Sequence, residues 1–170
     1  MRLRRIFPLL LLQTLLFSAF VFSKNVGDDE FVDIRSVDKT IVIDLRYAGS
    51  NNVAHHPLYP PGTPALVRGG VARRLVVAQE YLRKKGYGLK IWDAYRTQSA
   101  QKQLWQITHN HSFVADPKEG RGSMHIRGAA VDATLVDAEG RDVPMPTDFD
   151  NFSEGAFLNI PDAIRSSAAT

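Results

Sequence analysis

The sequence predicts a single folded domain that combines strands with helices. The chain has 170 residues, which is enough for one domain of ordinary size and hardly for two. Apolar residues alternate with other residues over 40–47, as in a half-buried strand, whereas the apolar residues over 71–82 recur at the spacing of a helix. Hydrophobic residues make up 44% and charged residues 23% of the chain, which excludes a disordered polar chain and a multi-span membrane protein.

The first 23 residues predict a secretory signal peptide. Three arginines near the N-terminus precede an almost unbroken apolar run over 6–22, and the small Ser23 suits a cleavage site. An uncleaved anchor is the alternative, but a run of about 17 residues is short for a membrane span, which needs roughly 20. We therefore expect residues 24–170 to form one periplasmic or secreted domain without a stable membrane anchor.

The excess of positive charge belongs to this leader. The chain has 21 Lys and Arg against 18 Asp and Glu, and the three arginines of residues 1–23 account for the difference. A neutral mature domain lacks the basic character of a nucleic-acid-binding protein, so we expect no nucleic-acid partner. The chain has no cysteine, which excludes disulfides, thiolate metal ligands, a cysteine nucleophile and a lipoprotein anchor.

Local signals define the elements of the first half of the mature domain. Ile41, Ile43 and Leu45 share one face of the first predicted strand. A cluster of prolines and glycines then breaks regular structure, and Gly86 is placed to terminate the helix that follows. In chain order we expect a polar lead-in over 24–38, a strand over 40–47, a loop over 51–64, a helix over 71–82 and a short strand over 89–94.

The second half is expected to contain one more helix and one more strand. Thr97 and Ser99 are both candidates for the N-cap of that helix. The helical spacing turns its apolar residues inward and its glutamines outward. The inward residues are expected to be Ala100, Leu104 and Ile107. Composition and alternation then predict a loop over 109–124 and a strand over 131–136.

The segment 123–132, Ser-Met-His-Ile-Arg-Gly-Ala-Ala-Val-Asp, indicates chemistry. His125 and Asp132 offer a nitrogen and an oxygen donor, and both types suit zinc. Seven residues of straight strand would span roughly 23 Å, so a shared metal requires a chain reversal, for which Gly128 supplies the conformational freedom. On spacing alone, a surface histidine beside an unrelated strand aspartate is the alternative. An aspartate within an apolar strand favours the metal, because a buried carboxylate needs a cation or donors nearby.

This ten-residue Ser-x-His-x-x-Gly-x-Ala-x-Asp pattern resembles the zinc motif of D-alanyl-D-alanine dipeptidases. These VanX-type metallopeptidases are related to D-Ala-D-Ala carboxypeptidases and to the hedgehog signalling domain. Two further segments match in the right order, and the resemblance runs from about residue 30 to Glu154. The two segments are Ile43-Asp-Leu-Arg-Tyr-Ala48, followed by Asn51-Asn52, and Trp92-Asp-Ala-Tyr-Arg96. The resemblance implies an α+β fold of the hedgehog/DD-peptidase type, with an antiparallel sheet carrying the zinc site and helices packed on it. It also implies hydrolysis of the D-Ala-D-Ala dipeptide.

The resemblance assigns roles to four residues. His125 and Asp132 would hold Zn²⁺, which activates a bound water and polarises the scissile carbonyl. Arg96 is similar to the arginine that stabilises the oxyanion of the transition state, and a surface salt bridge is its alternative role. Ser123 is similar to a serine that binds substrate, and a hydroxyl that stabilises a turn is its alternative. Tyr95 is expected in the core rather than in contact with substrate.

The resemblance does not extend to the third metal ligand and the general base. In the family both come from a C-terminal Glu-x-x-His motif, which this sequence lacks. The histidines that precede His125 are expected to be exposed loop residues: His55, His56, His109 and His111. We therefore expect a dipeptidase-like domain that is incomplete at its C-terminus through truncation or a frameshift. Two alternatives stay open: a non-catalytic remnant that binds peptidoglycan peptides, and a D-Ala-D-Ala carboxypeptidase that acts on longer peptides.

Overall fold

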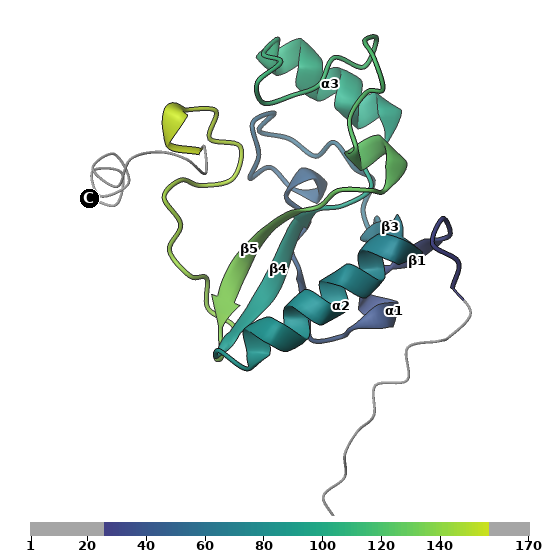
Figure 1. The fold of residues 1–170 in the computed structure, drawn as a ribbon. Coiled ribbons are helices and arrows are strands. Elements are labelled where there is room, and N and C mark those ends of the chain that lie inside the picture. Colours follow the sequence, from purple (N-terminus) through teal and green to yellow (C-terminus); the bar gives the residue numbers. More distant parts are fainter. Residues whose placement is uncertain (1–25, 157–170) are drawn as a thin grey trace, which may run out of the picture.

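A computed structural model describes residues 26–156 of the chain, which form a mixed α+β structure with two small sheets and three helices (Figure 1). The predicted signal peptide, 1–23, and the segment 157–170 lie outside the described residues. Within the described part of the chain, every helix is too short or too polar to cross a lipid bilayer.

The larger sheet has three strands in the order β2-β4-β5. These strands are β2 (Val42–Ile43), β4 (Tyr87–Asp93) and β5 (Asp132–Asp137). β4 pairs antiparallel with β5, as expected, but β2 pairs parallel with β4. The expected antiparallel sheet is thus corrected to a mixed one. A long connection that includes a helix separates β2 from β4, and such a crossover brings the chain back in the same direction.

The first strand is shorter than its alternating pattern predicted. Only Val42–Ile43 pairs as a strand, and Arg46–Ala48 forms a 3₁₀ turn instead of continuing the strand over 40–47. The turn directs Tyr47 into the interior, where it is 2% exposed. Packing of this aromatic ring therefore overrides the local strand pattern.

The expected polar lead-in over 24–38 contains regular structure that the sequence did not reveal. β1 (Phe31–Asp33) pairs antiparallel with β3 (Leu66–Arg68) in the second sheet, and α1 (Ile34–Val37) follows directly. Ile34 is 1% exposed and belongs to the core. Elements of three or four residues are too short to show a period, so the pattern could not predict them.

Helix α2 (Gly69–Arg83) confirms the helix expected over 71–82 and packs against the larger sheet beside β4 (Figure 1). Gly86 follows it at φ +80°, and its N–H donates to the carbonyl of Arg83. The first core cluster lies between this helix and the sheet. Its buried members are Ile34, Ile41, Ala65, Val67, Ala72, Leu75, Ile91 and Ala94.

Helix α3 (Gln98–Thr108) begins at Thr97, whose hydroxyl accepts a hydrogen bond from the N–H of Ala100 at 3.2 Å. Two expectations for this helix were wrong. Ile107 is 45% exposed rather than inward, and Gln101 is 1% exposed rather than outward. The second core cluster packs beneath α3. Its buried members are Tyr47, Tyr59, Ala100, Leu104 and Val114.

Candidate metal and catalytic site

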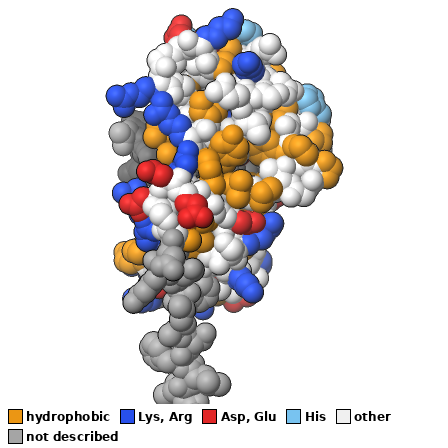
Figure 2. Space-filling view, turned by 90° about the vertical axis from the view of Figure 1, so that its right-hand side faces the viewer, with side chains coloured by type: hydrophobic (Ala, Val, Ile, Leu, Met, Phe, Trp, Pro, Cys, Tyr) orange, Lys and Arg blue, Asp and Glu red, His pale blue; other side chains and the backbone are white. Residues whose placement is uncertain are grey.

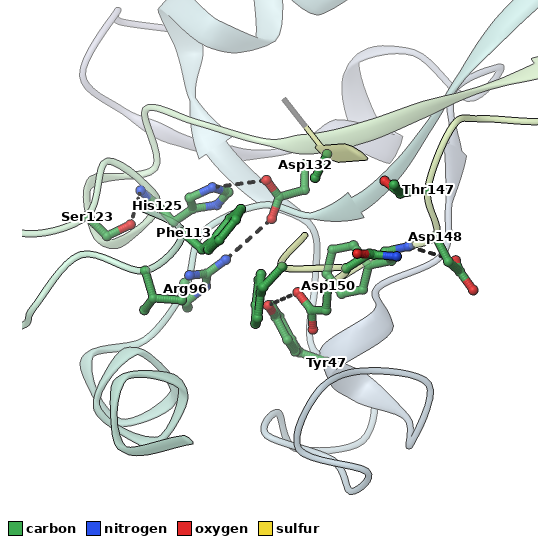
Figure 3. A pocket seen from close by; sticks show the side chains of 14 residues that line it. Tyr47, Arg96, Phe113, Ser123, His125, Asp132, Thr147, Asp148 and Asp150 are labelled. Carbon is green, nitrogen blue, oxygen red and sulfur yellow. Dashed lines mark hydrogen bonds and ion pairs between the residues drawn. The ribbon is translucent and has the colours of Figure 1, made fainter. Parts of the chain in front are cut away.

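The candidate site is a cavity of about 240 Å³ at one end of the larger sheet. β4 ends and β5 begins beside it, and residues of the segment 147–152 form the opposite wall (Figure 3). The predicted site residues Arg96, Ser123, His125 and Asp132 all line this cavity, together with Tyr47 and Asp150.

Strand register brings two carboxylates together at this end of the sheet. Asp93 is the last residue of β4, Asp132 is the first of β5, and the two are paired across the strands. Up to Ile91 the pairing is regular, but a β-bulge then adds one residue, Trp92, to β4. The bulge therefore places Asp93 opposite Asp132.

The chain reversal expected at Gly128 is present. His125–Arg127 forms a 3₁₀ turn, and Gly128 follows at φ +66° with its N–H donating to the carbonyl of His125 at 3.0 Å. The turn is fastened to the rest of the site, because the N–H of Arg96 also donates to the His125 carbonyl, at 3.1 Å. The reversal brings His125 Nε2 to 3.4 Å from Asp132 Oδ1 (Figure 3).

The hydrogen bonds of the His125 ring fit a metal ligand. Nδ1 lies 3.0 Å from the carbonyl oxygen of Ala94, which can only accept, so we assign the ring proton to Nδ1. The lone pair of Nε2 then faces an oxygen of Asp132, an arrangement that a cation between the two atoms would stabilise. Two ligands of one tetrahedral zinc are roughly 3.4 Å apart, given bond lengths of about 2.1 Å. The observed separation of 3.4 Å matches this value.

Asp93 completes a group of three metal-type side chains with His125 and Asp132, whose donor atoms lie within 4.8 Å of one another. Its geometry differs from that of a ligand. Oδ1 accepts from the hydroxyl of Tyr59 at 2.5 Å, and Oδ2 lies 2.8 and 2.9 Å from two nitrogens of Arg96. Oδ2 also faces His125 Nδ1, at 3.3 Å, on the ring edge away from Asp132. Asp93 therefore orients Arg96 and the histidine ring, as carboxylates behind metal-bound histidines do.

Arg96 is buried beside these carboxylates, so the alternative of a surface salt bridge is wrong. It is 6% exposed, and one of its terminal nitrogens lies 3.4 Å from Asp132 Oδ2. Its guanidinium also stacks over the ring of Tyr47. Burial opposes the charge, but Asp93 and Asp132 outweigh it and raise the pKa of Arg96, so the guanidinium is always protonated.

The surroundings of Asp132 also stabilise the ionised form of its carboxylate. Burial disfavours the carboxylate, but without a metal the hydrogen bond and charge of a protonated His125, together with Arg96, lower the pKa of Asp132 below its ordinary value. The side chain is thus ionised at neutral pH, which is the form that binds a metal. A metal between the two side chains would take the place of the proton on Nε2.

The Ser123 hydroxyl has a structural contact as well as a place in the cavity wall. It accepts a hydrogen bond from the N–H of His125 at 3.2 Å, and the residue is 9% exposed. The turn-stabilising role is therefore present, and contact with substrate stays a prediction. Tyr95 does not line the cavity, as expected, but it is only half-buried and packs edge-on against Phe31 outside both core clusters.

Sequence reasoning assigned no role to Asp150 in the opposite wall. Its two carboxylate oxygens accept from the hydroxyl of Tyr47 at 2.9 Å and the N–H of Val53 at 3.0 Å (Figure 3). Its φ of +57° is unusual for a residue other than glycine. Asp150 thus holds the segment after β5 against the loop after β2, two regions about a hundred residues apart in sequence.

The other histidines lie away from the site. His55, His56, His109 and His111 are exposed, as expected. Figure 2 shows histidine side chains at the edges of one face, and apolar side chains gather near the middle of that face.

Comparisons with known proteins identify the family of the chain. The family model for peptidase M15, described as D-ala-D-ala dipeptidase, matches residues 27–170. The D-alanyl-D-alanine dipeptidase of Escherichia coli (strain K12) is 34% identical over 135 residues, which cover 78% of this chain and 67% of that protein. The family match and this relative thus indicate a peptidase, within a family of metallopeptidases. The chain belongs to peptidase family M15, the D-Ala-D-Ala dipeptidases.

Proposed function

We propose that this protein is a zinc-dependent dipeptidase that hydrolyses D-Ala-D-Ala, with His125 and Asp132 holding the zinc. One observation carries the proposal: His125 Nε2 faces Asp132 Oδ1 at 3.4 Å, with the Arg96 guanidinium at 3.4 Å from the other oxygen of the same carboxylate. When bound, zinc lowers the pKa of a water molecule and polarises the scissile carbonyl.

The residues around the donors have separate tasks in this proposal. Arg96 stabilises the oxyanion that develops on the scissile carbonyl, because its charge is permanent and its N–H groups are fixed before the reaction. Asp93 keeps the histidine ring and the guanidinium in their orientations. Ser123 lies in the same wall of the cavity and is placed to hydrogen-bond the dipeptide. A cavity of about 240 Å³ suits a small substrate of this kind.

A non-catalytic peptide-binding protein is the second candidate, and the donor count favours it. Catalytic zinc sites normally have three protein ligands. Of the three metal-type side chains gathered in the described part of the chain, Asp93 is engaged by Tyr59 and Arg96, which leaves two. We therefore expect zinc to bind more weakly here than at a site with three ligands.

Release of D-alanine separates the two candidates. Purified protein incubated with zinc and D-Ala-D-Ala should release free D-alanine, and a chelator should stop the release. Arg96→Lys should lower kcat by about 100-fold or more, because lysine cannot reproduce the planar guanidinium that Asp93 holds in place. Arg74→Lys, on the exposed side of α2, is the matched control. Binding of zinc and dipeptide without release would support the binding protein, and faster cleavage of a pentapeptide ending in D-Ala-D-Ala would support a carboxypeptidase.

The hedgehog/DD-peptidase type of fold and the export of the protein are also part of the proposal. The mixed α+β structure and the family membership support the first. The arginines and apolar run of residues 1–23 support export to the periplasm or the medium. Fractionation of cells that express the full chain should recover the protein outside the cytoplasm, and recovery in the cytoplasm would contradict export.

A further inference from the structure

A buried glutamine connects helix α3 to the arginine of the site. Gln101 is 1% exposed, and its side-chain oxygen accepts from Arg96 Nη1 at 3.0 Å. Its side-chain nitrogen donates to the carbonyl of Ala115 at 2.7 Å. Both ends of the amide are therefore engaged, which fixes which end faces Arg96.

The contact with Gln101 is at the part of the guanidinium that the carboxylates leave free. Asp93 Oδ2 contacts Nε and Nη2 of Arg96, and Asp132 lies near Nη2. Nη1 is hydrogen-bonded to Gln101. A planar group held along one edge can still tilt about that edge, whereas a second contact at Nη1 fixes its plane.

The side chain of Gln101 is uncharged, which preserves the positive charge of Arg96. Arg96 already lies beside Asp93 and Asp132, and a third carboxylate would neutralise more of the positive charge that an oxyanion requires. An amide oxygen orients the guanidinium without adding negative charge. The bond to Ala115 also ties the same amide to the loop that leads to Ser123 and His125.

We infer that Gln101 is a positioning residue that fixes the plane of the Arg96 guanidinium toward the reacting carbonyl. The inference rests on the proposed function in so far as Arg96 acts on substrate. The orientation of Arg96 itself does not depend on that function and is measurable separately.

The chain offers a matched control in Gln79. This glutamine is 2% exposed on α2, and its amide is also engaged at both ends, with Thr40 and with the N–H of Leu89. It lies outside the cavity of the site. Gln79→Met and Gln101→Met therefore remove equally buried amides, and only the second removes a contact to Arg96.

The first measurement is ¹⁵N NMR of arginine side chains, with Arg96 assigned from an Arg96→Lys variant. In the native protein and in Gln79→Met, the two Nη signals of Arg96 should be resolved, because rotation of the group is blocked. In Gln101→Met the Nη1 signal should shift and broaden, because Nη1 loses its acceptor while Asp93 still holds Nε and Nη2. Gln101→Glu keeps the acceptor and should keep the Nη1 signal sharp. Merged signals in the native protein, or an Nη1 signal in Gln101→Met as sharp as in Gln79→Met, would overturn the inference.

The second measurement is the affinity of the zinc-loaded protein for D-Ala-D-Ala and for its phosphinate analogue, a tetrahedral anion that resembles the transition state. Gln101→Met should weaken phosphinate binding by roughly tenfold and dipeptide binding by less than about twofold, since positioning acts on the transition state. An equal loss in Gln79→Met would overturn the inference. A native protein that does not prefer the phosphinate would contradict the proposed function, while the NMR result would still decide the role of Gln101.

Discussion

At the scale of single residues, Asp93 is the most constrained side chain of the site. It is fully buried, with Tyr59, Arg96 and His125 around its two oxygens. Burial raises the pKa of its carboxyl, and Arg96, His125 and Tyr59 oppose this effect. Removing one partner of a buried charge leaves that charge poorly compensated, which costs more than the contact itself is worth.

Tyr59→Phe tests this dependence. The hydroxyl donates to Asp93 at 2.5 Å, so its loss should lower the free energy of unfolding by about 1–3 kcal/mol. Urea unfolding measures the change. Tyr81→Phe, at a tyrosine that is 59% exposed, should change stability by less than about 0.5 kcal/mol. Equal effects of the two substitutions would show that the hydroxyl of Tyr59 contributes nothing specific.

At the scale of elements, the turn between His125 and β5 depends on a glycine. Gly128 has φ +66°, and a Cβ built there would clash with a ring carbon of Phe31. Phe31 is held in turn by Tyr95 and by the Arg68 guanidinium over its ring. The position therefore requires both a left-handed backbone and the absence of a side chain.

Gly128→Ala and Gly140→Ala separate these two requirements. Gly140 has φ +81° with open space around it, so alanine there should cost only the backbone strain, about 1–2 kcal/mol. Gly128→Ala should cost more, because Phe31 must also move. Thermal unfolding compares the two variants. A smaller loss for Gly128→Ala than for Gly140→Ala would contradict the role of the Phe31 contact.

Elements with strong local patterns were the ones that the sequence predicted. The apolar spacing of α2, the cap at Thr97 and the reversal at Gly128 are properties of a few neighbouring residues. The role of Gln101 was not predicted because a polar residue on a helix is normally exposed. The role of Asp93 was not predicted because the sequence of a strand does not show which side chains an aspartate will contact. Only the folded chain brings Arg96 beside both.

At the scale of the whole molecule, the site lies between the two core clusters. Ile91 and Ala94, on either side of Asp93, belong to the first cluster, and Tyr59, which contacts Asp93, belongs to the second. Folding of both clusters thus fixes the side chains that support the metal donors. A metal that binds only this arrangement stabilises the native state of the entire domain.

Zinc should therefore raise the Tm of the protein, and a chelator should reverse the shift. At a free zinc concentration 100 times the Kd, the added stability is about 2.7 kcal/mol. His125→Ala and Asp132→Ala should abolish the zinc-dependent part of Tm, and His56→Ala, at an exposed loop position, should keep it. Unchanged zinc shifts in the first two variants would show that the ligand assignment is wrong.

The bulge at Trp92 limits which changes of sequence the end of β4 can tolerate. Regular pairing would place Asp93 opposite Val131, and the one extra residue moves it opposite Asp132. Straightening the bulge without changing the chain length would therefore slip the two carboxylates past each other and put Trp92 opposite Asp132, although the strand would keep its apolar character. We expect this short stretch to tolerate replacement of side chains far better than the insertion of a residue, which would again change the residue that lies opposite Asp132.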